Sequence, residues 1–288
     1  MREGSVQCAH PGGMHRMAFV EWGDPHNPKV LICVHGLTRC GRDFDDLAQA
    51  LAADYRVVCP DVAGRGQSEW LPDPAMYNLP QYGADMMTLI ALLAPQALHW
   101  VGTSMGGLIG MGLAVQPAGA GMCPISKLVL NDVGPLITAV SLQRIGQYLG
   151  QPPRFDGYAQ AEAYVRAVSA SFGTLSDAQW QHLTTHVIRR AADGQFEFRY
   201  DPALAFNYQQ ALVASGGRDI ELWALYDMIA CPTLLLRGKN SDLLTADTAQ
   251  AMTRRGPCAQ LVEIEGVGHA PTLMANEQIE IVRRFLLD

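Results

Sequence analysis

The sequence lacks the features of a membrane-spanning, secreted or nucleic-acid-binding chain. Charged residues make up only 17% of its 288 residues and the net charge is −7, which argues against nucleic acid as a partner. No apolar run approaches the roughly 18 residues that cross a membrane. The N-terminus has no apolar segment typical of a signal peptide, and no internal repeat is present. We therefore expect a globular cytoplasmic protein that acts on a small molecule, with no nucleic-acid or membrane partner.

The cysteines also exclude two classes of protein. There are seven, an odd number, and their spacing fits neither a disulfide framework nor a zinc site. We expect free thiols and no metal. Hydrophobic residues make up 49% of the chain, which is enough for the large core of a single α/β domain.

Short apolar runs bounded by turn signals predict the buried strands of a largely parallel sheet. These runs are residues 17–22, 29–36, 55–61, 97–104, 127–134, 232–238 and 259–266. Helical patterns lie between several of them, at 43–53, 81–94 and 105–115. Strands that alternate with helices predict an α/β fold with a doubly wound, mostly parallel sheet.

The alternation stops between residues 135 and 230, where only helical patterns are found. Apolar residues from Ala161 to Phe172 recur at helical spacing, and Ser176 with Gln179 forms a capping box before the next helix. We expect a core formed by residues 1–134 and 231–288. The helical segment 135–230 is then a cap or lid, inserted between two sheet strands.

One motif carries the chemistry. Gly102-Thr103-Ser104-Met105-Gly106 matches G-x-S-x-G, and it lies where a predicted strand meets a predicted helix. Such a turn bends the backbone sharply and presents the serine hydroxyl above the sheet. Ser104 is therefore the candidate nucleophile.

A serine nucleophile needs a base, and the base needs an orienting carboxylate. His269 follows the last predicted strand in the loop "EGVGHAP", which is the expected place for the base. Two acids follow strands at the same end of the sheet, Asp242 in "RGKNSDLL" and Asp132 after 127–131. From loop position we expect Asp242 to be the acid, with Asp132 as the alternative.

The developing oxyanion needs two backbone N–H donors. Met105 directly follows the nucleophile, and Leu37 lies in the "HGL" loop after the strand 29–34. We expect both amides to form the oxyanion hole. His35 in the same loop is expected to order the loop and not to act as a second base.

These segments resemble the α/β-hydrolases of the lidded, esterase-like kind over nearly the full length of the chain. The resemblance rests on "VHGL", "DVAGRGQS", "GTSMGG", "LLLRGKNSD" and "GVGHAP", which occur in this order. It implies a serine hydrolase in which Ser104, Asp242 and His269 act as nucleophile, acid and base. It also implies that the insertion supplies the substrate pocket and that no metal or organic cofactor takes part.

The substrate is not decided by these motifs. Candidate substrate-binding residues are Arg39 and Phe44 in the loop after Leu37, and Trp180 and Trp223 in the insertion. Three functions stay open: hydrolysis of a carboxylic ester or lactone with a small to medium acyl group, carbon–carbon hydrolysis of a vinylogous diketone acid, and ligand binding with little turnover. Carbon–carbon hydrolysis would be favoured by a carboxylate-binding Arg39. Whether the chain forms a homo-oligomer also stays open.

Overall fold

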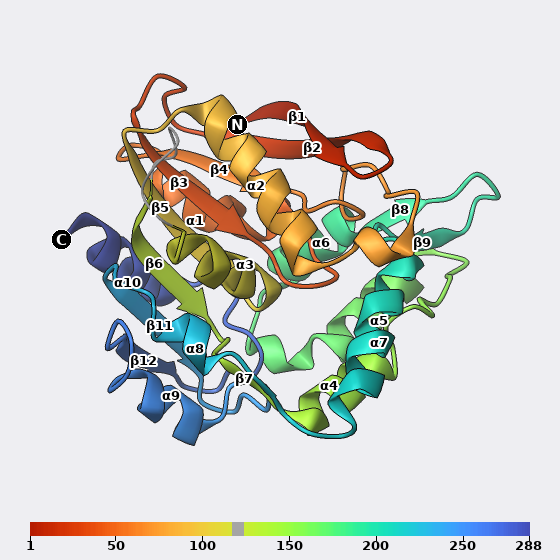
Figure 1. Cartoon of the computed structure of the whole chain (residues 1–288). Coiled ribbons are helices and arrows are strands. Elements are labelled where there is room, and N and C mark those ends of the chain that lie inside the picture. Colours follow the sequence, from red (N-terminus) through yellow and green to blue (C-terminus); the bar gives the residue numbers. More distant parts are fainter. Residues whose placement is uncertain (117–123) are drawn as a thin grey trace.

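The computed structural model describes residues 1–116 and 124–288. An eight-stranded sheet in the order β1-β2-β4-β3-β5-β6-β11-β12 runs through the centre of the molecule (Figure 1). Its strands are β1 (Arg2–His10), β2 (Gly13–Trp22), β3 (Lys29–Val34), β4 (Arg56–Pro60), β5 (Ala97–Thr103), β6 (Ile125–Asn131), β11 (Thr233–Gly238) and β12 (Gln260–Ile264). The six strands from β4 to β12 are parallel, and the hairpin β1-β2 joins them in antiparallel orientation.

The predicted mostly parallel sheet is confirmed, and each predicted strand corresponds to one in the structure. Strand β1 was not predicted, because its sequence REGSVQCAH buries little more than Cys8 and has no continuous apolar run. Cys123 lies outside the described residues. The other six cysteines are free thiols, as expected.

Helices cover both faces of the sheet, as alternating side chains along each strand require. In β3, Leu31 and Cys33 face one core with α1 (Asp45–Leu51) and α10 (Asn276–Leu287). Val30 and Ile32 face the other core, which is completed by α2 (Leu79–Leu93), α3 (Met105–Ala114), α8 (Trp223–Tyr226) and α9 (Ala246–Met252). Short 3-10 turns lie at Gly41–Phe44 (η1) and Pro74–Met76 (η2). No helix among the described residues is long and apolar enough to cross a membrane.

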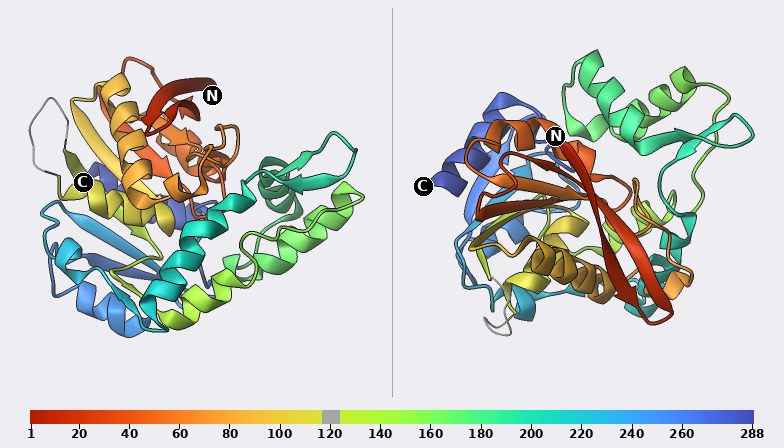
Figure 2. Two further views of the ribbon diagram at one scale, coloured as in Figure 1. Left: turned by 45° about the vertical axis from the view of Figure 1, so that its right-hand side comes forward. Right: turned by 90° about the horizontal axis from the view of Figure 1, so that it is seen from above.

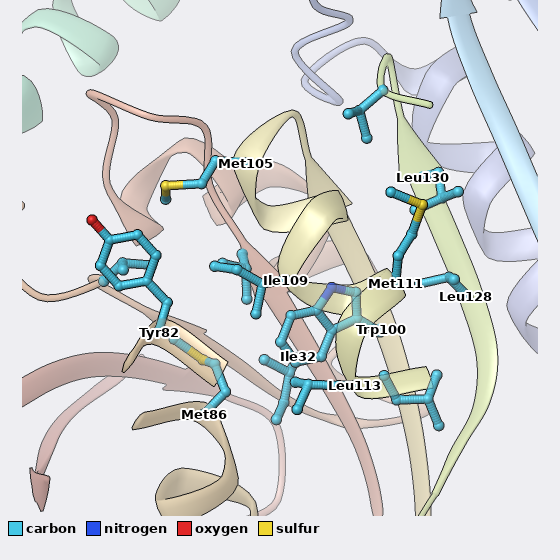
Figure 3. Packing of buried hydrophobic residues seen from close by; sticks show 14 of the residues in the cluster. Ile32, Tyr82, Met86, Trp100, Met105, Ile109, Met111, Leu113, Leu128 and Leu130 are labelled. Carbon is cyan, nitrogen blue, oxygen red and sulfur yellow. The ribbon is translucent and has the colours of Figure 1, made fainter. Parts of the chain in front are cut away.

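The second core packs α3 tightly against the sheet. The Trp100 side chain is fully buried beneath α3, and its indole N–H donates to the Gly106 carbonyl at 3.0 Å. Figure 3 shows Trp100 among Ile32, Ile109 and Met111 in this cluster. The start of α3, which follows Ser104, is therefore fixed on a rigid base.

The segment between β6 and β11 leaves the sheet and stands at one side of it (Figure 2). These two strands are neighbours in the sheet, although about a hundred residues separate them. The segment holds β7 (Leu136–Ile137), α4 (Ala139–Gly146), α5 (Tyr158–Val168), η3 (Ala170–Phe172), α6 (Asp177–Val187), β8 (Ile188–Arg190), β9 (Phe196–Phe198), η4 (Pro202–Leu204), α7 (Ala205–Ser215) and β10 (Ile220–Glu221), followed by α8.

The helices of this insertion follow the predicted patterns, and the capping box of Ser176 and Gln179 at the start of α6 is confirmed. The expectation of helices alone is wrong, because the pairs β7-β10 and β8-β9 form two small antiparallel sheets. Strands of two or three residues are too short to produce a readable periodicity in the sequence.

Candidate active site

Ser104 occupies a strained turn between β5 and α3. Its backbone has φ 52° and ψ −115°, a conformation that residues other than glycine rarely adopt. The turn is possible because Gly102 and Gly106 carry no side chain. A Cβ on Gly102 would clash with the Gly106 carbonyl oxygen, and one on Gly106 would clash with the Val34 carbonyl oxygen.

Ser104 and His269 are joined to Asp132, not to Asp242. The Ser104 Oγ lies 3.1 Å from His269 Nε2, and His269 Nδ1 lies 2.7 Å from Asp132 Oδ2. With the imidazole neutral, Nδ1–H donates to the carboxylate and Nε2 accepts from the serine hydroxyl. This arrangement allows the histidine to remove the serine proton while the carboxylate stabilises the resulting imidazolium.

Asp132 is held from several sides. Its side chain is fully buried, and besides His269 it accepts hydrogen bonds from the Gly238 N–H at 2.9 Å and from the Ser241 hydroxyl at 2.6 Å. Gly238 is the last residue of β11, the strand next to β6, and Ser241 lies in the loop after it. A buried carboxylate with three donors keeps a fixed orientation, as an orienting acid requires.

The prediction of Asp242 as the partner of His269 is wrong. Its carboxylate lies at the surface, with 57% of the side chain exposed, and it pairs with Arg144 of α4 at 2.7 Å. Asp242 and Asp132 follow adjacent strands, so loop position alone could not separate them. In the structure the Ser241 hydroxyl donates to Asp132, whereas the neighbouring Asp242 is directed to the surface.

The two predicted oxyanion-hole residues lie beside the serine. Leu37 lines the same cavity as Ser104, and Met105 is the first residue of α3, where a helix leaves its N–H groups without intrahelical acceptors. An unpredicted residue, Arg65, contacts both of them. Its Nε donates to the Leu37 carbonyl at 2.8 Å, and one of its terminal nitrogens lies 3.4 Å from the Met105 sulfur.

Arg65 is fully buried, which is rare for an arginine. It also donates to the Ala63 carbonyl at 2.7 Å and to the Tyr82 hydroxyl at 2.9 Å, and its guanidinium lies 4.8 Å from the Tyr82 ring centre. Figure 3 shows the Met105 and Tyr82 side chains at the same end of the core. Arg65 therefore fixes the loop that carries Leu37 relative to the start of α3.

Two further polar residues order the loops around the serine. His35 is fully buried, accepts from the Val62 N–H through Nε2 and donates to the Gly36 carbonyl through Nδ1, as expected for a loop-ordering residue. Burial lowers its pKa to about 4, so the ring is neutral at neutral pH. The Ser171 hydroxyl donates to the His269 carbonyl at 2.7 Å, which ties the insertion to the histidine loop. Sequence patterns gave no indication of this contact.

The serine opens into a cavity of about 420 Å³ between the sheet and the insertion. Of the predicted substrate-binding residues, Arg39 and Phe44 line it. Trp180 and Trp223 do not, so their prediction is wrong. Trp180 is buried against Leu183 and Met274, and Trp223 stacks on the Arg255 guanidinium at 4.2 Å. Their helical patterns showed that they were apolar but not which way each helix faced.

Among the described residues, two clusters combine side chains that are able to ligate a metal, and both lie outside this cavity. One consists of Cys8, His15 and Asp85, where burial and the Asp85 charge raise the pKa of the Cys8 thiol to about 12. The other consists of Asp45, His182 and His186. There Arg42 already occupies the Asp45 carboxylate at 2.7 Å.

Comparison with known proteins identifies the family of the chain. The model of the alpha/beta hydrolase family matches residues 31–280. The chain belongs to the alpha/beta hydrolase family. This hydrolase is 49% identical over 290 residues to a 3-hydroxybutyrate-oligomer hydrolase of Cupriavidus necator, with 99% of this chain and 97% of that protein covered.

Two further relatives of the hydrolase are more distant. It is 26% identical to a pimeloyl-[acyl-carrier protein] methyl ester esterase of Aeromonas salmonicida over 271 residues, with 89% of this chain and 94% of that protein covered. Among solved structures, a putative hydrolase of Rickettsia typhi superposes with a TM-score of 0.89 at 32% identity, with 99% of each chain covered. These relatives support a carboxylic ester hydrolase.

Proposed function

We propose that this enzyme hydrolyses the ester bonds of short 3-hydroxybutyrate oligomers through an acyl-enzyme. The observation that carries the chemistry is the chain of contacts from Ser104 Oγ through His269 to Asp132, in which Ser104 and His269 line one cavity. The substrate is inferred from the C. necator relative, which is 49% identical over nearly the full length.

In this mechanism His269 Nε2 takes the proton of Ser104 while Oγ attacks the ester carbonyl. The Leu37 and Met105 amides hold the oxyanion, and Asp132 stabilises the imidazolium. The tetrahedral intermediate expels the 3-hydroxyl oxygen of the leaving unit, which takes the proton from His269. Water then loses a proton to His269 and attacks the acyl group. Collapse of the second intermediate returns the proton to Ser104 and releases the acid.

We further propose that residues 135–230 act as a cap over a core formed by residues 1–134 and 231–288. The cap closes the cavity with side chains of α4, α5 and η3, and Ser171 joins it to the histidine loop. Free thiols in the described chain are compatible with the reducing cytoplasm, where we place the enzyme.

Carbon–carbon hydrolysis, the main alternative, loses the feature that favoured it. The Arg39 guanidinium already donates through Nε and Nη2 to the two carboxylate oxygens of Asp43, at 2.7 Å each, so its charge is neutralised within the protein. Ligand binding without turnover is disfavoured by the complete set of contacts at Ser104.

The test is cleavage of linear 3-hydroxybutyrate dimer and of p-nitrophenyl esters from acetate to decanoate. Wild-type enzyme should convert the dimer to two monomers, and Ser104→Ala should lower kcat by about 10⁶-fold, as loss of a serine nucleophile does elsewhere. Ser5→Ala, on the edge strand β1, is the matched control with unchanged rate. Near wild-type activity of Ser104→Ala would overturn the mechanism, whereas turnover of p-nitrophenyl esters but not of the dimer would overturn the substrate.

A further inference from the structure

The charges that line the cavity do not balance. Among the described residues and apart from histidine, the charged side chains in its wall are Arg39, Asp43 and Arg144. Arg39 and Asp43 neutralise each other through two hydrogen bonds of 2.7 Å, and their side chains are only 14% and 19% exposed. Arg144 is therefore the cation whose carboxylate partner does not itself line the cavity.

Arg144 lies in the last turn of α4 and has its partner outside the cavity. Asp242, in the loop after β11, contacts Arg144 Nε at 2.7 Å and Nη2 at 3.1 Å but is absent from the residues that line the cavity. The two side chains are 42% and 57% exposed, so this pair lies at the opening of the cavity, in contact with water. The pair holds α4 of the insertion against the β11 loop of the core.

Asp242 uses only one edge of the guanidinium. An arginine has five N–H donors in a planar fork, and a carboxylate binds two of them at a time. Asp242 accepts one hydrogen bond from Nη2 at 3.1 Å, and its other oxygen lies 2.7 Å from Nε as an ion-pair contact without a hydrogen bond. Among the described residues, the structure gives no other hydrogen bond to this guanidinium. The second edge, formed by Nη1 and Nη2, remains available to a second carboxylate.

We propose that Arg144 forms a carboxylate-binding subsite at the opening of the cavity, which receives the free carboxyl end of an oligoester substrate. This inference rests on the proposed function, because every linear 3-hydroxybutyrate oligomer ends in one carboxylate. Asp242 then acts as a positioning residue that orients the guanidinium. Recognition of the charged end also makes the enzyme discriminate against oligomers whose carboxyl end is esterified.

The test compares the linear dimer acid with the same dimer methylated at its carboxyl end, and follows cleavage of the internal ester bond. In Arg144→Gln, the ratio of kcat/KM for the acid to that for the methyl ester should fall at least tenfold, through KM. Arg144→Lys keeps the charge but loses the planar fork, so its ratio should fall less.

The matched control is Arg154→Gln. Arg154 belongs to the same insertion, is 43% exposed and pairs with Asp193 at 2.8 Å, but does not line the cavity. In Arg154→Gln, the ratio of kcat/KM for the acid to that for the methyl ester should equal the wild-type ratio. Equal effects of Arg144→Gln on acid and methyl ester, or no effect on either, would overturn the subsite.

Inhibition assays distinguish a failure of the proposed subsite from a failure of the proposed function. If wild-type enzyme cleaves neither dimer but cleaves p-nitrophenyl butyrate, the proposed substrate is wrong. The subsite is then tested by inhibition of that reaction with 3-hydroxybutyrate and with uncharged 3-hydroxybutyramide. Preference for the anion that falls tenfold in Arg144→Gln supports the subsite, and no preference for the anion overturns it.

Discussion

The floor and the rim of the cavity hold their charged groups in different ways. On the floor, Asp132 and Arg65 are fully buried and bonded to backbone groups of neighbouring loops. On the rim, Asp242 and Arg144 are about half exposed and bind each other across the boundary between core and insertion. Buried groups with several partners keep one orientation, whereas an exposed ion pair contributes only about 0–1 kcal/mol and exchanges readily with water. The floor is therefore suited to chemistry and the rim to selection of substrate.

The largest difference expected between floor and rim is that between the two aspartates. Asp132→Asn should lower kcat by about 10⁴-fold, because an amide holds His269 in the wrong tautomer while preserving shape. Asp242→Asn should change kcat on p-nitrophenyl butyrate by less than about threefold, since its ion pair is exposed. Steady-state kinetics of both variants decides the assignment. A larger loss in Asp242→Asn would reverse the roles given to floor and rim.

A smaller effect is expected at Arg65. Replacement by Met removes the donor to the Leu37 carbonyl, so kcat should fall by about 10²-fold with little change in KM, in the range of a disturbed oxyanion hole. Affinity for a boronic-acid transition-state analogue should fall in parallel. Arg65→Lys should recover part of both, and circular dichroism checks that each variant is folded. A rise in KM at constant kcat would show that Arg65 serves substrate binding instead.

The order of chemical groups along the chain was predictable, and their exact partners were not. G-x-S-x-G gave Ser104, and a glycine-flanked loop after the last strand gave His269, because both depend on local sequence. The choice between Asp132 and Asp242 depends on which carboxylate is buried beneath the histidine loop, a tertiary property. Arg65 was missed for the same reason. It lies in a turn whose sequence, "DVAGRGQS", gives no sign that the side chain points inward.

The smallest expected effect concerns stability and pH. Burial lowers the pKa of His35 to about 4 in the folded protein, below its ordinary 6.5. The unfolded chain therefore binds a proton more readily, and the stability associated with neutral His35 is full above pH 6.5 and is lost as pH falls toward 4. Between pH 7 and pH 5 this loss amounts to about 2 kcal/mol.

Urea unfolding at several pH values measures this loss. Asp61 opposes it, because burial raises its pKa to about 6 and its protonation favours the folded state as pH falls. Comparison of wild type with His35→Gln cancels the Asp61 contribution. The variant should lose about 2 kcal/mol less between pH 7 and pH 5. Equal slopes would mean that His35 is not held neutral on the floor.

The turn that carries Arg65 also limits which segments of the insertion can be exchanged without disturbing the active site. Gly66 donates its N–H to the Arg199 carbonyl at 2.9 Å, and Asp201 donates its N–H to the Gly64 carbonyl at 2.8 Å. Through Arg65, this junction is connected to the Leu37 loop. An exchange of α4 and α5 with those of a related enzyme would alter the pocket wall and leave the junction in place. An exchange that includes residues 199–201 would disturb the turn that holds Arg65, so an exchanged segment should end before residue 199.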